Sequence, residues 1–202
     1  RNCPAKEGQL IMVEHFYCQL DYEDVPYLSG MGAADGNVAN NGCGVCCSSM
    51  LIESMLGISF PPRESAKFCK ACGAREGFGT NYYICAGALA GRFSLRMRPT
   101  ESIDEVVRFL NENKNAKAVA NVRGDREGYT GVFSDGGHYV LIDGASGDEL
   151  RVYDPMYRAG RYDTPGRKGK VRMEGFAAYA DKEVLRQDCF ERPYFIFWQE
   201  NA

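Results

Sequence analysis

The chain has 202 residues, which is close to the usual length of one domain, about 150 residues. Hydrophobic residues make up 45% of it and charged residues 25%, the composition of a globular protein with a sizeable core. The 24 basic and 27 acidic residues are interspersed and leave a net charge of −3, which argues against a nucleic-acid-binding surface. The longest apolar runs, such as residues 194–198, are far shorter than the roughly 18 residues that a membrane span needs.

The nine cysteines are too few for a disulfide scaffold, and their odd number leaves at least one thiol unpaired. The N-terminal residues lack the apolar segment of a signal peptide. Both observations favour a reduced, cytoplasmic protein. The alternative is a secreted or cell-surface protein whose signal has been removed. The sequence predicts no oligomeric state.

Helical periodicity dominates the first half of the chain. It predicts helices over residues 43–55 and 63–72, a third after Thr80, and a fourth that opens with the capping box Ser102–Glu105 and ends near Asn111.

The second half has the pattern of strands, which are expected at residues 117–122, 139–143, 149–154 and 193–198. A glycine-rich loop, residues 124–137, separates the first two, and a loop of that length is usually functional or disordered. We therefore expect one α+β domain over residues 1–202, with a helical lobe at about 43–113 packed on an antiparallel sheet lobe at about 117–198.

His138 is one of only two histidines and follows a pair of glycines at the start of a predicted strand. If the following hairpin turns near Ser146, His138 lies directly opposite Asp154, at a Cβ separation of about 4.5–5.5 Å. A carboxylate so placed would orient the imidazole. Asp143 and Asp135 are the alternatives for that role, whereas His15 is expected at the surface without one.

Cys43 is the candidate nucleophile, because it opens the first predicted helix between Gly42 and Gly44. The free amides of a helix N-terminus stabilise a thiolate and can also bind an oxyanion. Gln19 is the candidate side-chain donor to that oxyanion. Cys46 and Cys47 lie one turn later, where we expect them to be buried as small apolar residues.

These four residues, in the order Gln19 in YCQLDY, Cys43 in GCGVCCSSML, His138 in GGHYVLIDG and Asp154 in VYDP, resemble the papain-like cysteine peptidases. The motifs are most similar to those of the peptidases that remove double-glycine leaders from bacteriocins, and of their stand-alone relatives. The resemblance covers about residues 17–155 and implies a papain-like cysteine proteinase fold with a cleft between its lobes.

By this resemblance Cys43 would be the nucleophile, His138 the general base, Asp154 its orienting partner and Gln19 the oxyanion-hole residue of a peptidase without cofactor or metal. The expected partner is a peptide or protein substrate. Two features depart from the family. The membrane spans and ATPase of its transporter-linked members are missing, and a glycine-rich insert at residues 27–42 separates Gln19 from Cys43.

The loop before His138 is expected to border the substrate. Gly137 would line the binding site, and Tyr129 and Phe133 would supply apolar contacts there. Hydrolysis and acyl transfer would use the same residues, so an acyltransferase is an alternative.

Two other classes of protein also remain. The first is a catalytically silent module that binds peptides with the same fold. The second is a zinc-stabilised interaction domain, because Cys43-x-x-Cys46 and Cys69-x-x-Cys72 have the spacing of zinc ligands. The Cys43-x-x-Cys46 pair as a redox motif is less favoured, since no βαβ unit precedes it.

Overall fold

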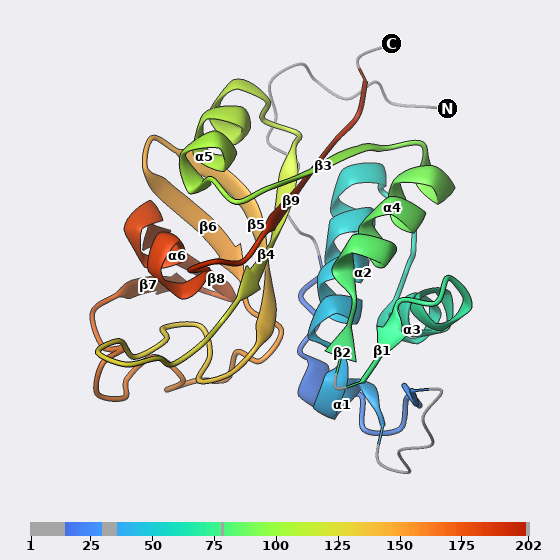
Figure 1. Ribbon diagram of the computed structural model, residues 1–202, viewed down its shortest axis with the longest axis horizontal. Helices are drawn as coiled ribbons and strands as arrows, with labels where there is room; N and C mark the ends of the chain where they lie inside the picture. Colours follow the sequence, from blue (N-terminus) through green and yellow to red (C-terminus); the bar gives the residue numbers. More distant parts are fainter. Residues whose placement is uncertain (1–14, 30–35, 78, 201–202) are drawn as a thin grey trace.

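A seven-stranded antiparallel sheet with the strand order β3-β9-β4-β5-β6-β8-β7 forms the centre of the computed structural model (Figure 1). The structure describes residues 15–29, 36–77 and 79–200. The strands of this sheet are β3 (Arg96–Thr100), β4 (Lys117–Val122), β5 (His138–Ser146), β6 (Glu149–Tyr153), β7 (Val171–Glu174), β8 (Ala177–Asp181) and β9 (Tyr194–Trp198). A separate two-stranded ribbon consists of β1 (Arg75–Glu76) and β2 (Gly79–Thr80).

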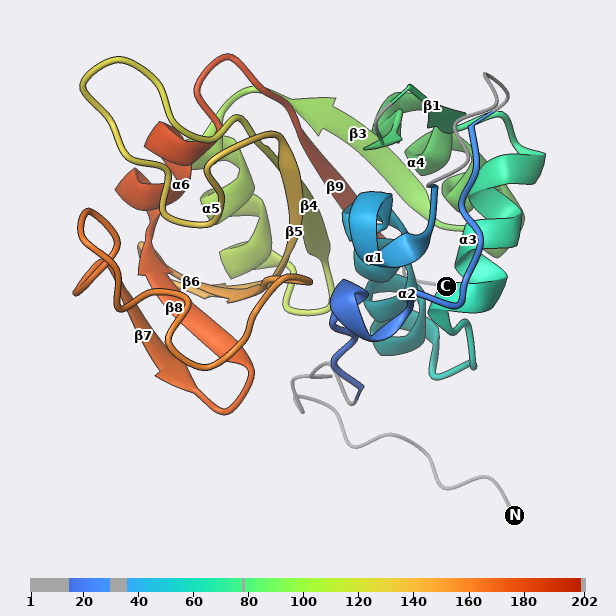
Figure 2. The ribbon, with the colours of Figure 1, turned by 90° about the horizontal axis from the view of Figure 1, so that it is seen from below.

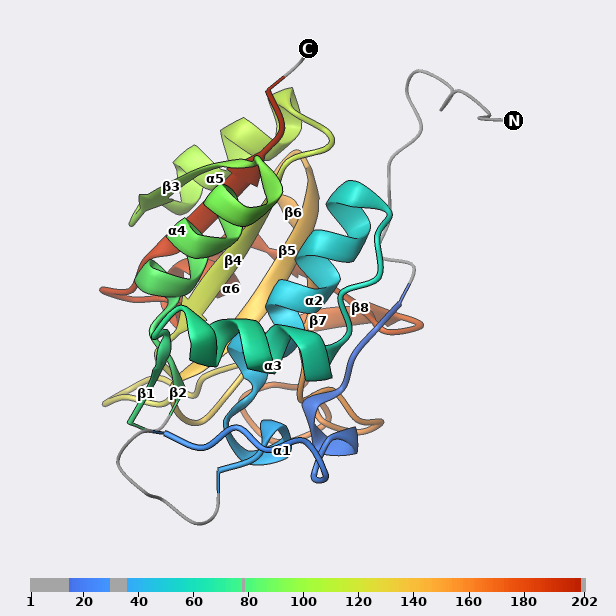
Figure 3. The same ribbon diagram turned by 90° about the vertical axis from the view of Figure 1, so that its right-hand side faces the viewer.

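Helices cover both faces of the large sheet. They are α1 (Val38–Asn41), α2 (Cys43–Leu56), α3 (Pro62–Ala71), α4 (Tyr82–Phe93), α5 (Ile103–Glu112) and α6 (Lys182–Asp188), with a 3-10 turn η1 (Gln19–Asp21) before them. Figure 3 shows α2, α3 and α4 in front of the sheet and α5 and α6 behind it. The predicted α+β class is confirmed.

The central strands are buried on both faces, so alternate residues enter two different hydrophobic clusters. On β4 and β5, Val119 and Leu141 pack with α2, α3 and α4, whereas Ala118 and Val140 pack with α5 and α6. This position explains why the sequences of β4 and β5 are apolar throughout rather than alternating. Helix α2 packs directly against β5 and is buried along nearly its whole length.

The division into a helical first lobe and a sheet second lobe needs two corrections. Residues 96–100 form β3, an edge strand paired with β9, inside the region expected to be helical. Its polar sequence, which includes Pro99, is tolerated because an edge strand has one unpaired side. Helix α5 packs on the face of the sheet opposite to α2.

The structure also contains β7, β8 and α6, in a region for which the sequence pattern predicts no element. Within the described ranges, no helix combines the length and the apolar composition needed to cross a membrane.

Candidate active site

Cys43 is the first residue of α2, as predicted, and close packing of its two glycine neighbours fixes its position. A Cβ atom on Gly42 would lie 2.4 Å from a methyl carbon of Val38, and one on Gly44 would lie 2.9 Å from the Cβ of Thr80. Any larger residue would push α2 away from these contacts. Gly42 also offers no side chain to cap the helix, which leaves the first-turn amides available to a ligand. As a residue, Cys43 is partly exposed.

His138 begins β5, where it pairs with Val122 at the end of β4. Its side chain is almost fully buried, and its Nε2 lies 2.7 Å from Oδ1 of Asp154. Because Asp154 takes Nε2, Nδ1 is the ring nitrogen left to interact with the neighbouring Cys43, and the two groups shift each other's pKa. The structure therefore places the Cys43 thiol, the His138 imidazole and the Asp154 carboxylate side by side, in that order. Figure 2 shows α1 and α2 lying beside this part of the sheet.

The predicted register of the hairpin that joins His138 to Asp154 is wrong. The turn was expected at Ser146, but Ser146 pairs with Glu149, so the turn lies at residues 147–148. A β-bulge between positions 142 and 144 shifts the register again.

Asp154 nevertheless reaches His138. The true register differs from the predicted one by two residues, and a shift of two keeps the Asp154 side chain on the same face of the sheet as His138. Leu141 pairs with Tyr153, which puts Asp154 opposite Val140 when the register is extended by one residue. His138 is the next residue along β5 on the same face. Such diagonal neighbours are within reach of long side chains.

The Asp154 carboxylate accepts four hydrogen bonds and is completely buried. Its Oδ1 accepts from Nε2 of His138 at 2.7 Å and from the backbone N–H of Met156 at 2.8 Å. Its Oδ2 accepts from Nε of Arg161 and from the hydroxyl of Tyr162, both at 2.7 Å. Burial opposes ionisation, but His138 and Arg161 outweigh it and lower the pKa of Asp154 to about 2. Asp154 is therefore a fixed negative charge.

The protonation of His138 and Cys43 is coupled through the hydrogen bond between them. Burial lowers the pKa of His138, but the negative charges of Asp154 and Cys43 raise it to about 9. Burial raises the pKa of Cys43, whereas His138 and the backbone amides of Tyr139 and Gly44 lower it below its ordinary value. Both shifts favour a thiolate–imidazolium pair, the reactive form of a nucleophilic cysteine.

Gln19 lies in η1, between the loop after Asp154 and the turn before Cys43. Its backbone N–H donates to the carbonyl of Pro155 at 2.7 Å, and its Nε2 donates to the carbonyl of Ala39 in α1 at 2.8 Å. Its Oε1 is buried and has no hydrogen-bond partner among the described residues. One N–H of the amide group remains for a further acceptor. The glycine-rich insert before Cys43 lies partly outside the described residues, at 30–35.

Two of the three residues expected to contact substrate from the loop are otherwise engaged. Phe133 is fully buried in the core, where its ring packs edge-on against Tyr162, so the expected contact with substrate is wrong. The Tyr129 hydroxyl donates to Oδ1 of Asp188 at 2.6 Å, and the residue ties the loop to α6. Phe133 and Tyr129 therefore stabilise the loop itself, the first through core packing and the second through its hydrogen bond. Gly137 is exposed, directly before His138, and has open space where a Cβ would lie.

The alternative carboxylates do not reach His138. Asp143 is fully buried five residues further along β5, in ion pairs with Lys117 and Arg151. Asp135 is exposed. His15 is largely exposed, as expected, and its Nδ1 lies 3.1 Å from Oε2 of Glu53.

Cys46 and Cys47 are fully buried on α2, as predicted, and burial raises the pKa of both thiols well above the ordinary value. They are therefore unreactive neighbours of Cys43.

The zinc interpretation required Cys43, Cys46, Cys69 and Cys72 to converge. The structure separates them instead: Cys43 contacts His138, and the sulfur of Cys69 on α3 lies 3.5 Å from that of Cys85 on α4. Nowhere in the described ranges do three His, Cys, Asp or Glu side chains gather in a group that fits a metal ion.

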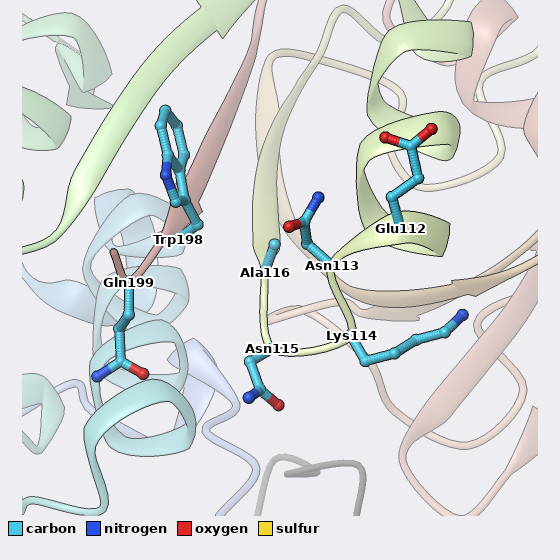
Figure 4. Close-up of a pocket in the computed structure, with 7 residues that line it drawn as sticks. All are labelled: Glu112, Asn113, Lys114, Asn115, Ala116, Trp198 and Gln199. Atoms are coloured by element: carbon cyan, nitrogen blue, oxygen red, sulfur yellow. The ribbon is translucent and has the colours of Figure 1, made fainter. Parts of the chain in front are cut away.

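Sequence reasoning missed Arg161 and Tyr162, which contact Asp154 from the loop after β6. That loop has no periodic sequence pattern, and neither residue belongs to a recognisable motif, so nothing in the sequence indicates their role. A hollow of about 210 Å³ lies between residues 112–116 and the end of β9 (Figure 4). It adjoins the start of β4, whereas His138 pairs with the end of that strand, so the hollow is not part of this site.

Comparison with known proteins supports the fold. The crystal structure of a chain described as a C39-like peptidase from Bacillus anthracis superimposes with a TM-score of 0.52, at 11% identity, over 89% of this chain and 97% of that one. The structure of UfSP from C. elegans gives a TM-score of 0.46 at 16% identity, over 95% of this chain and 34% of that one. No protein-family profile and no curated protein matches the sequence. The chain thus has an α+β fold of the papain-like peptidase kind.

Proposed function

We propose that the protein is a thiol hydrolase, most simply a cysteine peptidase that cleaves peptide or amide bonds through Cys43. The observation that carries the proposal is the series of three side chains that starts at the partly exposed residue Cys43: its thiol lies beside His138, which lowers its pKa, and Nε2 of His138 is hydrogen-bonded to the buried Asp154 carboxylate. A histidine with a purely structural role needs only one hydrogen-bond partner. It would not need a second neighbour whose thiol has a lowered pKa, as Cys43 has.

In the first half of the reaction the Cys43 thiolate attacks the carbonyl carbon of the scissile bond. The His138 imidazolium then donates its proton to the leaving nitrogen, the C–N bond breaks, and a thioester on Cys43 remains. Asp154 keeps the imidazole oriented through Nε2, which leaves Nδ1 to transfer the proton.

The oxyanion of the tetrahedral intermediate would lie at the N-terminus of α2. The backbone N–H of Cys43 and the free N–H of the Gln19 amide are its donors in this proposal, and each such donor is worth about 10²–10³ in rate. The anchoring of Gln19 to Pro155 and Ala39 supports a fixed direction for its amide.

In the second half His138 takes a proton from water, which attacks the thioester and releases the acid product and the Cys43 thiolate. An amine that reached the thioester before water would turn the same site into an acyltransferase. The substrate is a peptide or protein segment that passes beside Gly137, where the backbone is exposed. The protein needs no metal or cofactor for these steps.

A mixture-based peptide library, read by mass spectrometry, tests the proposal with wild type and two variants. Cys43→Ala should abolish cleavage. Cys72→Ala should retain it, because Cys72 is the matched control, a second partly exposed cysteine whose pKa burial raises rather than lowers.

Cleavage that survives in Cys43→Ala would contradict the nucleophile. Saturable peptide binding without cleavage by wild type, unchanged in Cys43→Ala, would replace the peptidase with a binding module of the same fold. A thioester at Cys43 that is released faster by added amines than by water would assign acyl transfer.

A further inference from the structure

Arg161 and Tyr162 hold the side of Asp154 that His138 does not use. Nε of Arg161 and the Tyr162 hydroxyl each lie 2.7 Å from Oδ2. Nη2 of Arg161 also donates to the carbonyl of Phe133 at 2.5 Å, so the guanidinium is fixed at two ends. The Arg161 side chain is mostly buried. An ion pair so enclosed is screened far less by solvent than one at the surface.

One carboxylate therefore serves two cations. When Cys43 is a thiolate and His138 an imidazolium, the buried group carries two negative charges, on Cys43 and Asp154, and two positive charges, on His138 and Arg161. Without Arg161 the full charge of Asp154 would act on the imidazolium alone. Several titratable groups surround the pair formed by His138 and Asp154. They are Cys43 and Cys47 on α2, Cys18 before η1, and Arg161 and Tyr162 after β6.

We propose that Arg161, assisted by Tyr162, weakens the hold of Asp154 on the His138 proton and so keeps the imidazole able to release that proton during turnover. Arg161 is a positioning residue, because it contacts neither Cys43 nor the reacting atoms. The catalytic consequence rests on the proposed function: His138 must donate a proton in one half of the reaction and accept one in the other. A histidine held too firmly as imidazolium would fail in both steps.

The structure supports a cationic role for Arg161 beyond that of a loop clamp. A clamp for the Phe133 carbonyl needs only a hydrogen-bond donor, whereas Nε is aimed at the carboxylate that orients the general base. Tyr162 supplies a neutral donor to the same oxygen and serves as an internal comparison. The two residues thus separate the effect of charge from that of hydrogen bonding.

The test needs no substrate, because NMR can observe the protonation of His138 directly. The chain has only two histidines, so one substitution leaves His138 as the only imidazole. In a His15→Gln, Cys43→Ala background the imidazole resonances belong to His138 alone, and NMR gives its pKa directly without coupling to a thiol. Arg161→Met should raise that pKa by about one unit, the size of a nearby charge in a partly screened site. Arg161→Lys, which keeps the charge, should leave it within a few tenths of a unit. Tyr162→Phe should raise it by less than Arg161→Met.

A His138 pKa that is unchanged or lowered in Arg161→Met overturns the proposal, and so does an equal rise in Arg161→Lys. If Arg161→Met fails to fold, Arg161→Gln with Tyr162→Phe decides by the same readout. Because the titration is read without turnover, failure of the charge proposal remains distinct from failure of the peptidase proposal.

Discussion

Two buried aspartates, Asp143 on β5 and Asp154 just after β6, offer a controlled comparison within one sheet. Asp143 pairs with Lys117 and Arg151, and Asp154 pairs with His138 and with a second arginine nearby. Both carboxylates have essentially no exposed surface, and each is shared by two cationic groups. Burial and ion pairing alone therefore do not distinguish a reactive site from a structural one.

The difference lies in the partners. Lys117 and Arg151 connect Asp143 to no nucleophile. The Lys117 ammonium on β4 and the Arg151 guanidinium on β6 both bind Asp143 on β5, so the cluster ties these three strands together. His138 can gain and lose a proton, with a pKa raised to about 9, and it connects the buried charge to the partly exposed residue Cys43. A carboxylate becomes a candidate for catalysis when its cation can pass a proton onward.

Asp154→Asn should produce the largest functional change. The amide cannot hold His138 as an anion would, and turnover of a library-derived substrate should fall about 10⁴-fold, as for other triads that lose this charge. Asp143→Asn is the matched control, with turnover per folded molecule expected within about threefold of wild type. Equal losses in the two variants, measured as kcat/KM, would remove the distinction between the two aspartates.

Asp143→Asn should instead produce the largest loss of stability. It leaves Lys117 and Arg151 buried without their anion, and removing one partner of a buried pair costs about 3–5 kcal/mol. Urea denaturation measures the free energy of unfolding. A loss below about 1 kcal/mol would show that water reaches this cluster. Replacing all three residues with apolar ones should restore most of the stability.

Gln19→Ala should lower kcat about 10²-fold with little change in KM, if its amide binds the oxyanion. Gln19→Glu should lower kcat at least as much, because a carboxylate repels the oxyanion. Steady-state kinetics on one cleaved peptide decides between this role and simple packing. A kcat within twofold of wild type in a folded Gln19→Ala variant would exclude Gln19 from the oxyanion hole.

The stability of the site should depend on pH in a defined direction. The pKa of His138 is raised to about 9, so its pair with Asp154 contributes its full stability below the unfolded value near 6.5 and loses it as pH rises through 9. Asp154 has its pKa lowered to about 2, so its contribution is present above about 4 and lost as pH falls through 2.

Denaturation at pH 6 and pH 9.5 measures the histidine part of this dependence. Wild type should lose at least about 1 kcal/mol more than His138→Gln over that interval. Parallel losses in the two proteins would mean that His138 is not held as an imidazolium.

Tyr129→Phe is expected to have the smallest effect. The variant loses the hydrogen bond to Asp188, worth about 1 kcal/mol, and should leave turnover and KM unchanged. A rise in KM would return Tyr129 to the substrate-binding role that its hydrogen bond to α6 argues against.

The residues at the ends of helices and strands were the easiest to predict. Glycines fixed the ends of α2 in the sequence pattern, which placed Cys43 at the helix start, and the shift from helical to strand periodicity placed His138 at the head of β5. Asp154 was identified through a register that is wrong by two residues. It was found because side chains alternate between faces, so an even shift keeps the same face.

Features that depend on tertiary contacts were missed. Arg161 and Tyr162 lie in an irregular loop, where no period connects sequence position to direction. Phe133 was expected beside the substrate because the loop is long, but its apolar ring is buried in the core. Strand β3 is too polar to predict from pattern alone, since its stability comes from pairing with the buried β9.

Alkylation by iodoacetamide, mapped by mass spectrometry to each of the nine cysteines between pH 5 and 9, measures whether Cys43 and His138 form an ion pair. Cys43 should react at least about tenfold faster than Cys72 at pH 6, and His138→Ala should abolish that advantage. A Cys43 that reacts no faster than Cys72, or whose rate does not depend on His138, would contradict the thiolate–imidazolium pair on which the proposed hydrolase depends.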